Sequence, residues 1–218
     1  MSLELVLASA SPRRKEIISL LGIPCLVEAS RFEEPPAPVS PVSLSDLVTS
    51  LAIEKALEVA CRLRREATPV VGADTLVTTS PDDIGVPLGK PKSDEDAVRM
   101  LRDLSGRTHA VYTGIAVVVY TRSGTDTPHP FVISRCVRTE VTFRALSDSM
   151  IADYVRTREP MDKAGAYGAQ GYAAPFIESF SGDFYNVVGL PICSLGKMLE
   201  ELGFEWQAQR TVLPQIIG

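Results

Sequence analysis

The sequence has little cysteine and no pattern that would bring its cysteines together. Its 218 residues include four cysteines and two histidines, with no C-x-x-C pair and no histidine pair nearby. Structural zinc sites and disulfide frameworks both need such residues in a shared arrangement, so neither is expected here. We expect Cys25, Cys61, Cys136 and Cys193 to stay reduced, and we predict a cytoplasmic location.

Long apolar runs are missing as well. No segment approaches the roughly 20 apolar residues that a membrane-spanning helix needs. The first ten residues are apolar, but no basic stretch precedes them and they run directly into Ser11-Pro12-Arg13-Arg14. They predict a strand rather than a signal peptide, and no membrane partner is expected.

The chain carries no excess of positive charge. Its formal net charge is −5 at pH 7, from 22 Lys and Arg residues against 27 Asp and Glu residues. A field of this sign does not attract polyanions, so long nucleic acid is not an expected partner and any basic site must be local. With 45% hydrophobic and 22% charged residues, the composition is that of an ordinary globular protein.

The order of apolar patterns predicts a mixed α/β domain whose helices cover a central sheet. We expect one domain over residues 1–204, followed by a tail over residues 205–218. The predicted strands cover residues 4–10, 69–79, 114–120 and 131–143, and the predicted helices begin at Ser11, at Ser43 or Ser45, at Ser93, at Ser147 and at Pro191.

Two adjacent arginines lie where a helix does not favour them. Arg13 and Arg14 fall in the first turn after Ser11, where the helix dipole is already positive. Together with the Ser9 and Ser11 hydroxyls and the backbone N–H groups of that helix terminus, the two guanidiniums would make a phosphate or triphosphate site. The alternative is that both arginines are solvated and that Ser11 is only a cap.

A lysine interrupts the apolar face of the second predicted helix. On a helical wheel, Lys55 falls among Leu51, Ala52 and Val59. Because an unpaired buried charge is very costly, its ammonium group must either meet an anion or extend to solvent along its own aliphatic stem. Both outcomes fit the pattern.

Asp74 interrupts an otherwise apolar predicted strand, Val70 to Val77. A metal ion, or a water molecule held by one, would give this carboxylate a partner and a role as ligand or general base. The alternative is an aspartate that turns out of a strand end to cap a loop. Glu33 and Glu34, in a proline-rich loop, could complete a metal site, although such residues are more often only solvated.

Two loops could line a nucleotide pocket. Lys90 lies between Gly89 and Pro91 in the first loop. Gln170 lies in the second loop, which runs from Asp162 to Gly171 and is rich in glycine from Gly165 onward. Glycines allow a ligand to approach the backbone closely, and the Gln170 amide can both donate to and accept from a base edge. Neither Walker-A nor G-x-G-x-x-G spacing is present, which argues against P-loop and dinucleotide enzymes.

These segments, in this order, resemble the Maf family. The resemblance spans about residues 3 to 203 and implies a fold similar to that of inosine triphosphate pyrophosphatases, with a mixed sheet, flanking helices and a cleft between two lobes. It is carried by LASASPRR (7–14), EKA (54–56), VGADT (71–75), GKP (89–91), EPMDKAGAYG (159–168) and NVVGLP (186–191).

The resemblance implies roles for individual residues. Asp74 would activate water, and Glu34 would help Asp74 to bind a divalent cation, Mg²⁺ or Mn²⁺. The triphosphate would be held by Ser9, Arg14, Lys55 and Lys90. Three positions that differ between family branches are Arg13, Thr75 and Gln170 here. They resemble the branch that cleaves dTTP or UTP to the monophosphate and pyrophosphate, and not the 7-methyl-GTP branch with Trp, Gln and Glu.

Two other functions stay open at this point. One is a broad house-cleaning pyrophosphatase for damaged purine nucleotides, which the fold would permit. The other is a non-catalytic regulator of septum formation or cell division that senses nucleotides in the same cleft. A homodimer is also plausible for such a fold, although no stripe of residues in the sequence specifies one.

Overall fold

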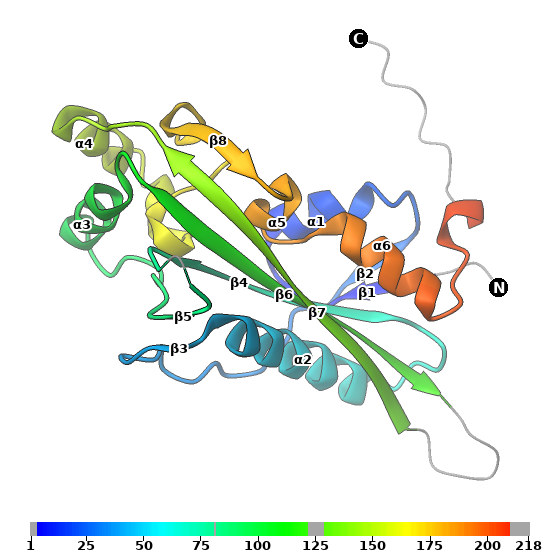
Figure 1. Ribbon diagram of the computed structural model, residues 1–218. Helices are drawn as coiled ribbons and strands as arrows, with labels where there is room; N and C mark the ends of the chain where they lie inside the picture. Colours follow the sequence, from blue (N-terminus) through cyan, green and yellow to red (C-terminus); the bar gives the residue numbers. More distant parts are fainter. Residues whose placement is uncertain (1–3, 81, 122–128, 210–218) are drawn as a thin grey trace, which may run out of the picture.

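The computed structural model describes residues 4–80, 82–121 and 129–209. Its centre is a six-stranded mixed sheet with the order β2-β1-β4-β6-β7-β8 (Figure 1). β1 is parallel to β2 and β4, and the other neighbours in this sheet are antiparallel. The strands are β1 (Leu5–Leu7), β2 (Cys25–Val27), β4 (Val70–Thr78), β6 (Thr108–Thr121), β7 (His129–Phe143) and β8 (Ile177–Ser181), and β3 (Val42–Ser43) pairs separately with β5 (Ile84–Gly85). The predicted mixed α/β class is confirmed.

The helices begin where the sequence places capping residues. Ser11, Ser93 and Ser147 accept hydrogen bonds as N-caps, and Ser43 is the cap chosen from the two candidates for the second helix. The helices are α1 (Pro12–Ser19), α2 (Leu44–Leu63), α3 (Asp94–Leu104), α4 (Asp148–Arg156), α5 (Phe184–Val188) and α6 (Ile192–Glu201), with 3-10 turns at Glu159–Asp162, Ala164–Ala166, Ala174–Phe176 and Trp206–Gln209.

The long helix α2 lies close against one face of the sheet because two strand residues there are glycines. A Cβ atom at Gly72 would lie 2.2 Å from the backbone oxygen of Ala52, and one at Gly114 would lie 2.2 Å from that of Val48. Small alanines of α2, among them Ala56, complete this contact. The helix therefore approaches the middle of β4 and β6 more closely than any larger strand residue would allow.

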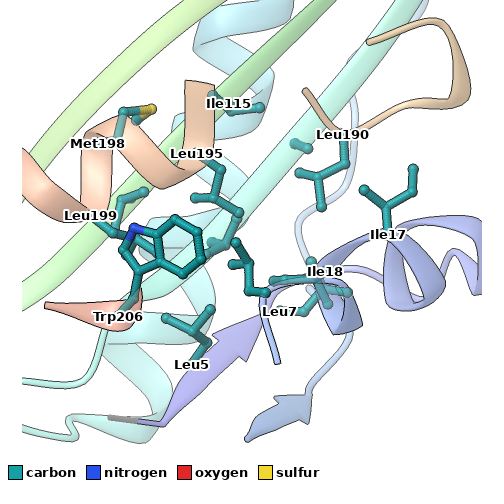
Figure 2. Packing of buried hydrophobic residues seen from close by; sticks show 14 of the residues in the cluster. Leu5, Leu7, Ile17, Ile18, Ile115, Leu190, Leu195, Met198, Leu199 and Trp206 are labelled. Carbon is teal, nitrogen blue, oxygen red and sulfur yellow. The ribbon is translucent and has the colours of Figure 1, made fainter. Parts of the chain in front are cut away.

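The opposite face of the sheet is covered by α1, α5 and α6. Leu5 and Leu7 of β1 pack with Ile18 of α1 and Leu195 of α6, and the Trp206 ring lies among them (Figure 2). Trp206 is 8% exposed, so the packing continues into the predicted tail, which begins at residue 205. Residues 210–218 of the predicted tail lie outside the described residues.

A second lobe forms around the far ends of β4, β6 and β7. α3 and α4 pack there on one core with the first three 3-10 turns, through residues that include Leu101, Phe143, Ile151 and Tyr154. The long strands β6 and β7 run through both lobes, as Figure 1 shows. None of the helices in the described parts of the chain is both long and apolar enough to cross a membrane.

Candidate active site

A cavity of about 720 Å³ lies between the two lobes. β1 pairs with β4 only as far as Leu7, which lies beside Val71. Beyond that point, the edge of β4 that faces away from β6 borders this cavity. Asp74 and Thr75, whose side chains point to opposite faces of the sheet, can therefore both line it. All nine predicted site residues are in the cavity wall: Ser9, Arg13, Arg14, Glu34, Lys55, Asp74, Thr75, Lys90 and Gln170.

Arg14 is fixed by three contacts at the start of α1. Its Nε donates to the Gly189 carbonyl at 2.8 Å, its Nη1 to Ser9 Oγ at 3.3 Å and its Nη2 to Thr75 Oγ1 at 3.2 Å. Burial lowers the pKa of Arg14, and the negative charge of Asp74 opposes that effect. The alternative of a solvated Arg14 is therefore wrong, because the guanidinium is oriented inside the cavity.

Arg13 is held less firmly than its neighbour. Its side chain is 33% exposed, and Nη1 lies 3.8 Å from a carboxylate oxygen of Asp162 in the other lobe. Asp162 also accepts a hydrogen bond from Lys163, and both of these residues line the cavity. The sequence predicts that the loop from Asp162 to Gly171 can line a nucleotide pocket, but it assigns no individual role to Asp162 or Lys163.

Lys55 joins two carboxylates at the base of the cavity. Its Nζ lies 2.5 Å from Asp74 Oδ1 and 2.6 Å from Glu34 Oε1, and its side chain is only 12% exposed. Of the two outcomes left open for Lys55, the structure has the ion pair and not extension to solvent. Burial raises the pKa of Asp74, while the charge and hydrogen bond of Lys55 oppose this shift.

Asp74 lies in the middle of β4, which continues to Thr78, so the alternative of a loop cap at the strand end is wrong. Its register partner on β6 is Gly114, and Gly72 precedes it on the same face. The two glycines that bring α2 close to the sheet therefore flank Asp74. This close packing lets the Lys55 ammonium group reach the carboxylate.

The two predicted loops meet the cavity from the second lobe. Lys90 and Gln170 are both exposed on its wall. The Gly165 N–H donates to the Gly89 carbonyl at 3.1 Å, which ties the Lys90 loop to the start of the glycine-rich stretch. The end of that stretch is held by Glu159, whose carboxylate accepts from Tyr154 Oη at 2.9 Å and from the Tyr172 N–H at 3.0 Å.

The oxygen donors at the base of the cavity fit a hard divalent cation that is bound together with phosphates. In the described parts of the chain, no group of three or more His, Cys, Asp or Glu side chains is arranged to hold a metal. Mg²⁺ commonly takes only one or two carboxylates and completes its shell with substrate phosphates and water. Asp74 and Glu34, which converge on the Lys55 ammonium group, offer this kind of donor set, whereas Glu33 does not line the cavity.

Known proteins resemble this chain over most of its length. Residues 4–202 match the protein family described as Maf-like protein. A protein of Moorella thermoacetica named dTTP/UTP pyrophosphatase is 45% identical over 208 residues, which cover 93% of this chain and 96% of the relative. A protein of the same name from Bacillus cereus strain B4264 is 41% identical over 202 residues, 93% of this chain and 97% of the relative.

Among solved structures, the Staphylococcus aureus Ham1 protein matches 91% of this chain and 99% of its own length at 16% identity, with a TM-score of 0.46. The family assignment depends on the sequence matches and not on this likeness. Since the match to the family runs through both lobes and every residue of the cavity base, the chain belongs to the Maf-like protein family.

Proposed function

We propose that this protein is a nucleoside triphosphate pyrophosphatase that hydrolyses dTTP and UTP to the monophosphate and pyrophosphate. The observation that carries the proposal is the buried Asp74 carboxylate at the base of a cavity that is also lined by Arg13, Arg14, Lys55 and Lys90. Four cations around one carboxylate suit a polyanion that is attacked by water. The names of the relatives, at 45% and 41% identity, support the same activity.

The triphosphate is bound at the start of α1. Arg14 and the Ser9 hydroxyl face the cavity there, at the positive end of the helix dipole. Lys55 approaches from α2 on one side, and Lys90 lies on the opposing lobe. The phosphates thus bridge the two lobes and neutralise cations of both.

Asp74 is the general base. It takes a proton from a water molecule whose oxygen attacks the α-phosphorus, the bond from the α-phosphorus to the bridging oxygen breaks, and pyrophosphate leaves. The raised pKa of the buried carboxylate strengthens it as a base, while the charge and hydrogen bond of Lys55 favour its ionised form. A divalent cation held by Asp74 and Glu34 would neutralise charge on the phosphates during this step.

The nucleobase of the substrate is selected by residues of the cavity wall. Arg13, Thr75 and Gln170 occupy the positions that distinguish the dTTP/UTP branch, and all three line the cavity. The Gln170 amide can donate to and accept from the edge of a pyrimidine. A thymine or uracil base next to this loop is the arrangement that we propose.

The test is hydrolysis of dTTP, UTP, CTP, ITP and 7-methyl-GTP with Mg²⁺ or Mn²⁺, with pyrophosphate resolved from phosphate. Fastest release of pyrophosphate from dTTP or UTP is expected. Faster turnover of ITP would favour the house-cleaning function, and release of single phosphates would contradict attack at the α-phosphorus. No turnover of any substrate would favour the regulator of cell division.

We also propose a cytoplasmic location, a folding domain over residues 1–204 and a homodimer. Cell fractionation tests the location, and sedimentation equilibrium tests the dimer. A single unfolding transition for a chain that ends at residue 204 would support the domain boundary. The burial of Trp206 makes this last experiment informative, because a marked loss of stability would place the boundary beyond residue 206.

A further inference from the structure

A line of hydrogen bonds runs from Arg14 beneath the cavity floor to α5. Arg14 Nη2 lies 3.2 Å from Thr75 Oγ1, which lies 2.9 Å from Thr113 Oγ1 on the neighbouring strand β6. Thr113 Oγ1 in turn lies 2.9 Å from the backbone oxygen of Asn186. Thr113 and Asn186 are both fully buried and neither lines the cavity.

The chemistry of the groups fixes the direction of each hydrogen bond. The Asn186 carbonyl can only accept, so the single hydroxyl proton of Thr113 points toward it. Thr113 must then accept from Thr75, which uses the proton of Thr75. The lone pairs of Thr75 are therefore directed toward Arg14, whose guanidinium can only donate.

A second contact of Arg14 leads to the same residue. Arg14 Nε donates to the Gly189 carbonyl, directly after α5. Asn186 anchors this short helix to the sheet, because its Nδ2 donates to the Val111 carbonyl at 3.1 Å and to Thr139 Oγ1 at 2.9 Å. Asn186 thus holds Arg14 by two routes. One runs through the hydroxyls of Thr113 and Thr75, and the other runs through the Gly189 carbonyl at the end of α5.

We propose that Thr113 is a positioning residue for the reaction, and that Asn186 is the anchor through which it acts. Thr113 orients the Thr75 hydroxyl, and Thr75 orients the Arg14 guanidinium for the triphosphate. Neither Thr113 nor Asn186 touches the substrate. This role rests on the proposed pyrophosphatase function, because it concerns the same cavity.

The test compares Thr113→Val with Thr113→Ser. Valine keeps the shape and removes the hydroxyl, whereas serine keeps the hydroxyl. The Asn186 carbonyl still accepts from the Gly189 N–H at 3.0 Å, so Thr113→Val leaves this buried oxygen paired, and we expect the fold to be retained. We expect kcat/KM to fall about tenfold in Thr113→Val, as for one lost hydrogen bond to an oriented group, and to return close to the wild-type value in Thr113→Ser.

Thr108→Val is the matched control. Thr108 lies on the same strand β6 and makes the same kind of cross-strand hydroxyl contact, with Thr142 Oγ1 at 2.9 Å, but it is exposed and far from the cavity. The kcat/KM of Thr108→Val should equal that of the wild type. A wild-type value for Thr113→Val as well would overturn the proposal.

A double-mutant cycle separates positioning from a general structural effect. If Thr113 acts through Thr75, then Thr113→Val causes no further loss in a Thr75→Val background. If the fold losses in kcat/KM of the two single variants multiply in the double variant, Thr113 acts by another route, and the proposal is contradicted.

A spectroscopic measurement tests the positioning without any turnover. The Arg14 Nε–H donates to Gly189, so its resonance should be resolved and slow to exchange with water in the wild type and in Thr113→Ser. It should broaden or exchange faster in Thr113→Val, and an unchanged resonance would overturn the proposal. An inactive wild type would instead contradict the proposed function and leave this measurement valid.

Discussion

At the scale of single residues, the site depends on one ammonium group between two carboxylates. Lys55 lies within 2.6 Å of both Asp74 and Glu34, and it opposes the effect of burial on the pKa of Asp74. The same ammonium group occupies the point where both carboxylates would meet a divalent cation. Lys55 therefore balances the charge of both carboxylates and would compete with a metal for them.

Replacing the proposed base tests the assignment of Asp74. Asp74→Asn keeps the size and can still accept a hydrogen bond from Lys55, so the fold should be retained. Loss of the proton acceptor should lower kcat by about 10²- to 10⁴-fold. The measurement is pyrophosphate release from UTP, with Asp153→Asn on the exposed face of α4 as the control. An active Asp74→Asn variant would refute the base.

Removing the competing ammonium group should change metal binding before any nucleotide is present. In Lys55→Met, Asp74 and Glu34 lose their cation, so we expect the Kd for Mn²⁺ to fall by about tenfold or more through uncompensated charge. The free Mn²⁺ signal in electron paramagnetic resonance measures this directly. Lys197→Met, at an exposed position of α6, should bind Mn²⁺ as the wild type does. Equal affinity in all three proteins would contradict the competition.

At the scale of elements, the position of α2 against the sheet decides the geometry of the site. Gly72 and Gly114 flank Asp74 and leave space for the backbone of α2. Their lack of a side chain brings Lys55 within reach of the carboxylate. Packing in the first lobe and chemistry in the cavity thus depend on the same two glycines.

A single methyl group at this contact should act on both stability and activity. In Gly114→Ala, the new Cβ would lie 2.2 Å from the Val48 backbone oxygen, so α2 must shift. We expect a loss of about 1 to 3 kcal/mol in the free energy of unfolding, measured in urea, and lower kcat/KM. The control for stability is Gly89→Ala, because a Cβ there would meet nothing within 4 Å. Equal unfolding midpoints for the two variants would contradict the close contact.

At the scale of the whole molecule, the stability at low pH depends on a buried histidine in the second lobe. His109 is 3% exposed, and its Nε2 lies 2.9 Å from Tyr167 Oη. Its ring packs edge-on against Phe143. Burial lowers the pKa of His109 to about 4, so this ring stays neutral where an exposed histidine is already protonated.

The resulting loss of stability has a defined sign and range. Below about pH 6.5 the unfolded chain takes up a proton that the folded protein does not accept until about pH 4. The stabilising contribution of His109 is therefore complete above pH 6.5 and falls by about 3 kcal/mol as the pH drops to 4. Urea unfolding across this range should show a smaller decrease for His109→Gln, which does not titrate. An identical pH dependence would contradict the assignment.

Much of this organisation is determined by the sequence itself. Apolar patterns predict most of the strands of the sheet. The serine caps and the order of the motifs predict the helices that cover it. Short elements were missed: β2, β8 and α5 have only three to five residues and too little pattern of their own. They form because β1, β7 and the buried Asn186 provide partners, and the sequence does not display those partners locally.

The sequence also determined which residue types gather at the site, since a lysine on an apolar face and an aspartate in an apolar strand both need partners. Only the tertiary structure decided which partners they have. Lys55 and Asp74 lie on separate elements, and their contact depends on α2 approaching the sheet over two glycines. Thr113 looks like an ordinary strand residue until its hydroxyl is seen between Thr75 and Asn186. The direction of a hydrogen bond and the depth of a helix contact depend on three-dimensional packing, which local sequence patterns do not specify.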